Sequence, residues 1–174
     1  LQVNQLSLQQ LKLRSSASNG DVLLQELVAQ FYGGDINVKG SVDVRGSSPK
    51  LAVTQQASNI QIGPVLKNAA ELNTISGKAT LNMDITTAGN SVDAWKKNID
   101  GPINMTLDTL VLDEINMEHM VCQAVALLDK KTMGKASENK TRVEKVTAKL
   151  AANSGLVQLQ SLTGTMATMN LKGS

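Results

Sequence analysis

The longest regular alternation of apolar and polar residues lies between Ile75 and Val111. Every second residue from Ala79 to Ile85 is apolar, and the same holds from Ile103 to Leu107. Successive side chains of a strand point to opposite faces, so this pattern predicts two long strands of a sheet with one apolar and one polar face. Between them, Ser91 to Ile99 predicts a short helix, because Asn90 or Ser91 can cap its first turn.

Other segments show the same alternation. Ile36 to Arg45 is the cleanest amphipathic strand, whereas Leu1 to Leu13 and Val22 to Tyr32 slip by one residue at several places. A bulge restores the face after each slip. Val22 to Tyr32 also fits a helical stripe, but the turn signals on both sides of it favour a strand. We expect bulges near Asn4-Gln5, Gln9-Gln10 and Gln25-Glu26. Further strands are expected at Leu51 to Asn59 and Arg142 to Ala151. A last hairpin is expected to turn at Thr163-Gly164, with strands Leu156 to Leu162 and Thr165 to Leu171.

Three segments have helical spacing: Gly63 to Glu71, Ser91 to Ile99 and Glu114 to Leu128. A polar connection at residues 131–140 follows the third. The predicted fold is therefore mainly β with helical insertions (α+β), in which antiparallel amphipathic strands are joined by hairpins. About three helices pack at the end of the sheet or on its apolar face. The 174 residues suffice for one domain, and we expect residues 1–174 to be a fragment of a longer protein.

Composition changes how the apolar face is interpreted. Aromatic residues make up only 2% of the chain, so Leu, Val, Ile, Ala and seven Met must supply the apolar surface. Such a surface is aliphatic and adaptable. It is either a thin core or a surface that contacts aliphatic ligands. The net charge of +2 gives no electrostatic reason to expect a nucleic acid partner. The lysine-rich stretch after Leu128 is interpreted as a solvated face and loop.

Residues for catalysis or metal binding are few. His119 is the only histidine, and Cys122, the only cysteine, lies about one helical turn away. Two such ligands do not make a metal site without further partners. The pattern contains no Gly-rich phosphate loop and no nucleophile with an orienting base. We therefore expect no enzymatic activity, no metal and no cofactor.

Several segments, in their order and spacing, resemble the C-terminal region of the AsmA family of Gram-negative bacterial envelope proteins. The resemblance covers nearly the whole chain. It rests on these segments: Ala29 to Ile36, Val42 to Gly46, Pro49 to Leu51, Ile60 to Leu66, Ile75 to Leu81, Gly89 to Ser91, Asp100 to Ile103, Ile115 to Leu128 and Thr141 to Gly155. It implies a curved, groove-like β-sheet similar to that of bridge-like lipid transfer proteins, with the family's membrane anchor outside this chain.

The resemblance further implies a location at the periplasmic face of the inner membrane and a role in phospholipid transport and outer-membrane homeostasis. The implied partners are phospholipid acyl chains, and other envelope proteins are a second class. The alternative is a structural or interaction module in outer-membrane protein assembly, whose apolar sheet face its own helices cover. Alternation alone nominates the groove-lining residues: Ile36, Val38, Val42, Val44, Ala79, Leu81, Met83, Ile85, Ile103, Met105 and Leu107.

The terminal strands Leu1 to Leu13 and Thr165 to Leu171 are expected at the two edges of the sheet. Unpaired strand edges invite pairing with another chain. The isolated chain is therefore expected to associate with itself edge to edge.

Overall fold

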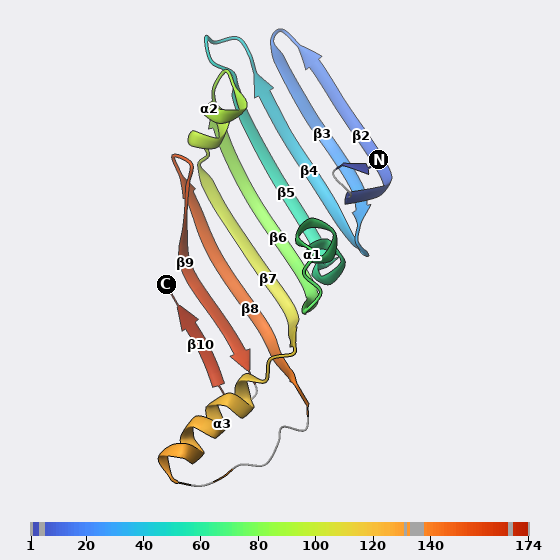
Figure 1. Ribbon diagram of the computed structural model, residues 1–174. Helices are drawn as coiled ribbons and strands as arrows, with labels where there is room; N and C mark the ends of the chain where they lie inside the picture. The colour runs from blue at the N-terminus through green and yellow to red at the C-terminus, as the bar shows by residue number, and fades with distance from the viewer. Residues whose placement is uncertain (1, 4–5, 131, 133–137, 167–168, 174) are drawn as a thin grey trace.

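The strands of the chain form one open antiparallel sheet in which each strand pairs with its neighbours in sequence (Figure 1). The computed structural model describes residues 2–3, 6–130, 132, 138–166 and 169–173. The short strand β1 pairs with β2 through two residue pairs, and β2 to β10 continue the sheet to its other edge. The strands are β1 (Gln2–Val3), β2 (Leu6–Ser18), β3 (Asp21–Phe31), β4 (Gly34–Asp43), β5 (Lys50–Gln61), β6 (Ile75–Ala88), β7 (Gly101–Asp113), β8 (Lys140–Asn153), β9 (Leu156–Met166) and β10 (Met169–Gly173).

This architecture confirms the predicted antiparallel, mainly β fold with three helices. The segment from Val22 to Tyr32 is a strand, as the flanking turns indicated. Its register shifts between Leu24 and Leu27, at the expected Gln25-Glu26 bulge. The bulge near Gln9-Gln10 is also present, since Gln10 has a φ of 50° where β2 changes register against β3. The bulge expected near Asn4-Gln5 lies outside the described residues.

The predicted turn at Thr163-Gly164 is wrong. β9 continues through both residues to Met166, and Gly164 pairs with Val146 on one side and Leu171 on the other. The reason is the length of β8, whose ladder offers hydrogen-bonding partners as far as Lys145, opposite Thr165. A Thr-Gly pair is a turn signal only where the neighbouring strand has ended.

The three helices are α1 (Ile62–Ala70), α2 (Val92–Lys97) and α3 (Met117–Leu128). Ser91 caps α2 by accepting a hydrogen bond from the Ala94 N–H at 3.1 Å. α1 lies over the sheet and α2 at the end of β6, whereas α3 extends beyond the ends of the strands (Figure 1). Most of the predicted polar connection at 131–140 falls outside the described residues.

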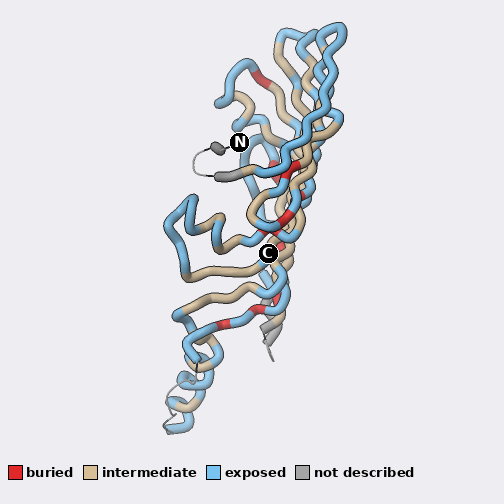
Figure 2. Tube along the Cα trace, turned by 90° about the vertical axis from the view of Figure 1, so that its right-hand side faces the viewer, coloured by how far each residue is buried: buried red, intermediate tan, exposed pale blue. Residues whose placement is uncertain are grey.

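The core is thin because the sheet is a single layer (Figure 2). The buried apolar residues among those described are mostly small, and five of the six lie on β5 or β8. They are Ala29, Ala57, Ile60, Val143, Ala148 and Ala152. Most apolar side chains of the sheet are therefore half-buried or exposed, and the apolar face is a surface as much as a core.

Candidate functional site

The pairing register aligns apolar side chains in rows that cross the sheet. Directly opposed residues of an antiparallel pair project on the same face, so each chain of pairs defines one row. The longest row runs across eight strands, from β2 to β9, and has one polar member. It consists of Leu13, Leu27, Val38, Gln55, Met83, Ile103, Leu150 and Leu159. At about 4.8 Å between strands, this row is about 33 Å long.

A second row lies beside the first. Its members are Ala29, Ile36, Ala57, Leu81, Met105, Ala148 and Leu162. Ile85 opposite Val53, and Ala79 opposite Leu107, extend the same apolar face towards the two ends of the strands. We call this surface the apolar face.

The structure brings the residues nominated by alternation together on the apolar face. Ten of the eleven lie within β4, β6 and β7, and all ten are half-buried. The eleventh, Val44, is exposed and follows the last residue of β4, where its N–H donates to the Gly20 carbonyl oxygen at 2.9 Å. Val44 therefore lies at the end of the face and not in a row.

The opposite face is polar along the same strands. Its central row is made of amides, a lysine and a serine: Asn37, Gln56, Asn82, Asn104, Lys149 and Ser161. A neighbouring row places Thr80, Thr106, Thr147 and Thr163 opposite one another. Because water solvates this side, the apolar face is the side of the sheet that gains from being covered.

α1 covers one part of the apolar face. It follows β5 directly, contacts β6 and β2, and lies over β5 and β6 in Figure 1. Ala57, in the second row, and Ile60, opposite Ala79, are buried near the start of α1. The Asn68 amide donates to the Tyr32 hydroxyl at 2.6 Å, which fixes α1 to the turn between β3 and β4.

α2 lies at the rim of the apolar face. The Trp95 indole N–H donates to the Gly89 carbonyl oxygen at 2.7 Å, just beyond the end of β6. The Thr87 hydroxyl, in the same row as Leu51 and Val42, donates to the Trp95 carbonyl oxygen at 2.7 Å. Trp95 is thus held against the strand end, and α2 leaves the centre of the face uncovered.

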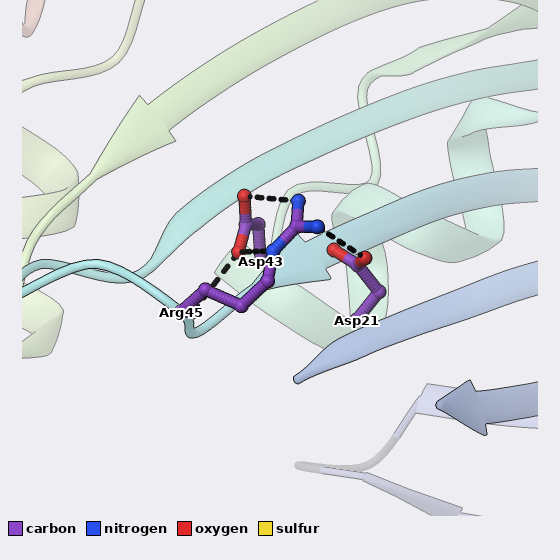
Figure 3. Close-up of polar contacts among 3 residues, drawn as sticks. All are labelled: Asp21, Asp43 and Arg45. Atoms are coloured by element: carbon purple, nitrogen blue, oxygen red, sulfur yellow. Dashed lines mark hydrogen bonds and ion pairs between the residues drawn. The ribbon is translucent and has the colours of Figure 1, made fainter. Parts of the chain in front are cut away.

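A charged cluster lies at one end of the sheet, beside Val44 (Figure 3). The Arg45 guanidinium contacts both carboxylate oxygens of Asp43, at 2.9 and 2.8 Å, and one oxygen of Asp21 at 3.1 Å. These hydrogen bonds hold the pKa of the Asp43 carboxyl well below its usual range and raise the pKa of Arg45. The cluster joins the start of β3 to the end of β4 and thereby fixes the end of the apolar face.

Gln55 is a residue of the face that alternation did not nominate. It is half-buried and lies between Val38 and Met83 in the longest row. The signal for this position is its alternation with Leu51, Val53 and Ala57, since every second residue of a strand projects on the same face, but only apolar side chains were nominated. Leu13, Leu27 and Leu159 were missed because bulges in β2, β3 and β9 break the alternation. Leu150 follows the regular alternation of Val146 and Ala148 in β8 and was not nominated.

The described residues contain no group of three or more His, Cys, Asp or Glu side chains that could hold a metal ion. His119 and Cys122 both lie on α3, and Cys122 is exposed. A cavity of about 650 Å³ beside the start of α3 is lined by polar and charged residues, among them Glu118, Lys140 and Arg142. Among the described helices, none is long and apolar enough to cross a bilayer.

Fold and surface together define a class of protein: an open, single-layer antiparallel sheet with one continuous aliphatic face. The AsmA family model matches residues 1–162, and the chain belongs to the AsmA family. The chain is 26% identical over 160 residues to Protein AsmA of Escherichia coli strain K12. The match covers 89% of this chain and 25% of that protein, so the chain spans about a quarter of the length of this relative. No solved structure matched the chain significantly. Membership of this family points to an envelope-associated protein.

Proposed function

We propose that this chain is a non-enzymatic segment of a lipid conduit at the periplasmic face of the inner membrane, where it carries phospholipid acyl chains in support of outer-membrane homeostasis. One observation carries the proposal: the row of largely aliphatic side chains from Leu13 to Leu159, which crosses eight strands without a covering layer over most of its length. Membership of the AsmA family supports the location in the cell envelope.

The dimensions of the apolar face suit this role. A row of about 33 Å is close to the thickness of a bilayer's hydrocarbon core, about 30 Å, and so accommodates acyl chains along its length. Each buried methylene contributes about 0.8 kcal/mol, which holds a lipid without specific polar contacts. Met83 and Met105 in adjacent strands add flexible side chains that adapt to chains of different shape.

The alternative, an interaction module in outer-membrane protein assembly, required the helices to cover the apolar face. α1 covers one region, α2 lies at the rim and α3 extends away from the strands. The uncovered centre, at Val38, Met83 and Ile103, favours an aliphatic ligand over a closed core.

Photo-crosslinking in the full-length protein tests the proposal. A photoreactive residue in place of Val42 or Met83, both on the apolar face, is expected to capture phospholipid in cells. Matched positions on the polar face of the same strands, Lys39 and Lys78, are the controls. Capture from the lysine positions alone would contradict the proposal, and capture of a protein from Val42 and Met83 would favour the interaction module.

A further inference from the structure

α1 lies in a connection that is longer than the sheet requires. Three other pairs of adjacent strands, β2–β3, β3–β4 and β8–β9, are joined by two residues each, at Asn19-Gly20, Tyr32-Gly33 and Ser154-Gly155. β5 and β6 are adjacent and antiparallel as well, yet residues 62–74 join them. These additional residues place a helix over the apolar face, where it contacts β6 and also β2 (Figure 1).

The contacts that hold α1 on the apolar face are weak. Its apolar side chains Ile62, Val65 and Leu66 recur at helical spacing, and they are half-buried. No residue of α1 is fully buried in the described chain. The hydrogen bond from the Asn68 amide to the Tyr32 hydroxyl, at 2.6 Å, is exposed to water. Water competes for such a hydrogen bond, so its net contribution to the position of α1 is small.

The two ends of α1 also disfavour the helix. Gln61, at the N-cap, makes no side-chain hydrogen bond to the first turn in the described chain, whereas Ser91 and Asn116 cap the other two helices. At the other end, Glu71 has a φ of 56°, in the left-handed position where helices usually have glycine. A helix of nine residues is marginal in water even without these defects. α1 therefore has the low local stability that elements which open and close require.

We propose that α1 is a displaceable cover of the apolar face, and that a phospholipid acyl chain takes its place over Ala57, Ile60 and Ala79. Ala57 belongs to the second apolar row, and Ile60 lies opposite Ala79 on the same face. Ala57 and Ile60 are 5% and 7% exposed, so a displaced α1 leaves apolar surface that favours an apolar ligand. The acyl chain as occupant rests on the proposed function, because it reaches this place along the open rows.

A cover and its ligand compete for the same surface. The apparent affinity for lipid is the intrinsic affinity multiplied by the fraction of chains in which α1 has moved away. A change that loosens α1 therefore tightens lipid binding, and a change that holds α1 in place weakens it. A helix that only completes the core predicts no such gain, because loosening it would leave lipid binding unchanged or weaken it.

Two substitutions shift α1 in opposite directions. Tyr32→Phe keeps the aromatic ring, whose centroid lies 4.6 Å from that of Phe31, and removes the hydroxyl that accepts from Asn68. Glu71→Gly relieves the left-handed backbone at the end of the helix, since glycine has no Cβ. Glu71→Gln is the matched control, because it removes the same charge and keeps the strained conformation. Circular dichroism verifies that all three variants are folded.

Binding of a fluorescent phosphatidylcholine to the 174-residue chain is the first measurement. We expect binding about fivefold tighter in Tyr32→Phe, the factor for one lost hydrogen bond. Binding should be about fivefold weaker in Glu71→Gly, which removes the cost of a left-handed residue. Glu71→Gln should stay within about twofold of the native chain, as for a surface substitution.

Hydrogen exchange without lipid measures the opening of α1 separately. The amides from Leu66 to Ala70, which are hydrogen-bonded within the helix, should exchange faster than those of β5. Their exchange should be faster still in Tyr32→Phe and slower in Glu71→Gly. Protection of α1 equal to that of β5 would show that the helix does not open, and would overturn the inference whether or not the chain binds lipid.

Lipid binding that is unchanged in Tyr32→Phe, or that moves in the same direction in Tyr32→Phe and Glu71→Gly, would also overturn the cover. Capture of phospholipid at Met83 would in that case still support the proposed function. A chain whose α1 opens but which binds no phosphatidylcholine would instead contradict the proposed function, and with it the acyl chain as the occupant.

Discussion

The Thr141 hydroxyl accepts a hydrogen bond from the backbone N–H of Met117 at 2.8 Å and thereby joins the first turn of α3 to the first residues of β8. Thr141 is only 2% exposed, and among the described residues it is the one buried residue with a polar side chain. The same hydroxyl donates to Ile115, so one side chain satisfies two backbone groups at the helix start. The orientation of α3 relative to the sheet therefore depends on this threonine.

Thr141→Val keeps the shape of the side chain and removes the hydroxyl. Two backbone groups then lose the partner of a part-buried hydrogen bond, and we expect the free energy of unfolding to fall by about 1–3 kcal/mol. Urea denaturation measures this, with Thr141→Ser as the control that retains the hydroxyl. The thiol of Cys122 should also react at a changed rate in the valine variant, because α3 is less firmly held. Equal stability of the two variants would show that the hydroxyl does not anchor the helix.

The Asp43–Arg45 contact predicts a pH dependence of stability. The pKa of Asp43 is lower in the folded chain than the value of about 3.9 expected when unfolded, because Arg45 donates to its carboxylate. This stabilisation is present above about pH 4 and is lost as the pH falls through the folded pKa. Melting temperatures measured from neutral pH into acid should converge for the native chain and Asp43→Asn. A constant difference between them across that range would contradict the assignment.

Met83→Glu places a charge at the centre of the apolar face. Lipid binding by the purified chain should weaken about tenfold or more. A tenfold loss of affinity is about 1.4 kcal/mol, which is less than the contribution of two buried methylenes. Asn82→Glu is the matched control, since Asn82 is the neighbouring residue on the polar face of β6. Binding of a fluorescent phospholipid measures both. If the two variants bind equally, the apolar face is not the lipid site.

Gly34→Ala tests the close packing of β4 on β5. A Cβ at Gly34 would meet the Ser58 carbonyl oxygen and lie 2.6 Å from the Asn59 carbonyl carbon. The backbone would have to shift, so the free energy of unfolding should fall by about 1–3 kcal/mol. Gly46→Ala provides the comparison, because a Cβ there comes no closer than 3.9 Å to Ser48. Urea denaturation of both variants should separate them clearly.

The outer strands of the sheet predict self-association. β1 pairs with only two residues of β2, so much of β2 lies at one edge, and β10 lies at the other. Exposed strand edges pair with other strands. Sedimentation velocity over a concentration series is expected to show association, reduced by Leu13→Lys in β2. A monomer at all concentrations would show that these edges do not pair.

Periodicity predicted the elements that have regular alternation, and it failed where the backbone departs from it. β4, β6 and β7 were assigned to the right faces because their apolar residues recur at every second position from Ile36, Ala79 and Ile103. Pairing between strands was not readable in the same way. The register that aligns Gln55 with Val38 and Met83 depends on hydrogen bonding between strands, and the extension of β9 through Gly164 depends on the length of β8.

The exposure of α3 could not be predicted from the sequence either. Its apolar stripe, from Met117 to Leu128, predicts a helix that packs on the sheet, since most amphipathic helices do so. The direction of the helix is set by the hydrogen bonds of Asn116 and Thr141 at its first turn. Those contacts join residues more than 20 positions apart, and no local pattern encodes them.

The strictly sequential strand order has a consequence for how the sheet is assembled and how it can evolve. Each strand pairs only with the strands before and after it, so no contact between distant parts of the chain must form before the sheet can grow. Repeat proteins with nearest-neighbour contacts gain and lose units without disrupting the remainder. A hairpin inserted into or removed from this sheet would lengthen or shorten the apolar face by two strand spacings, about 10 Å. The reach of such a protein is therefore set by its number of hairpins.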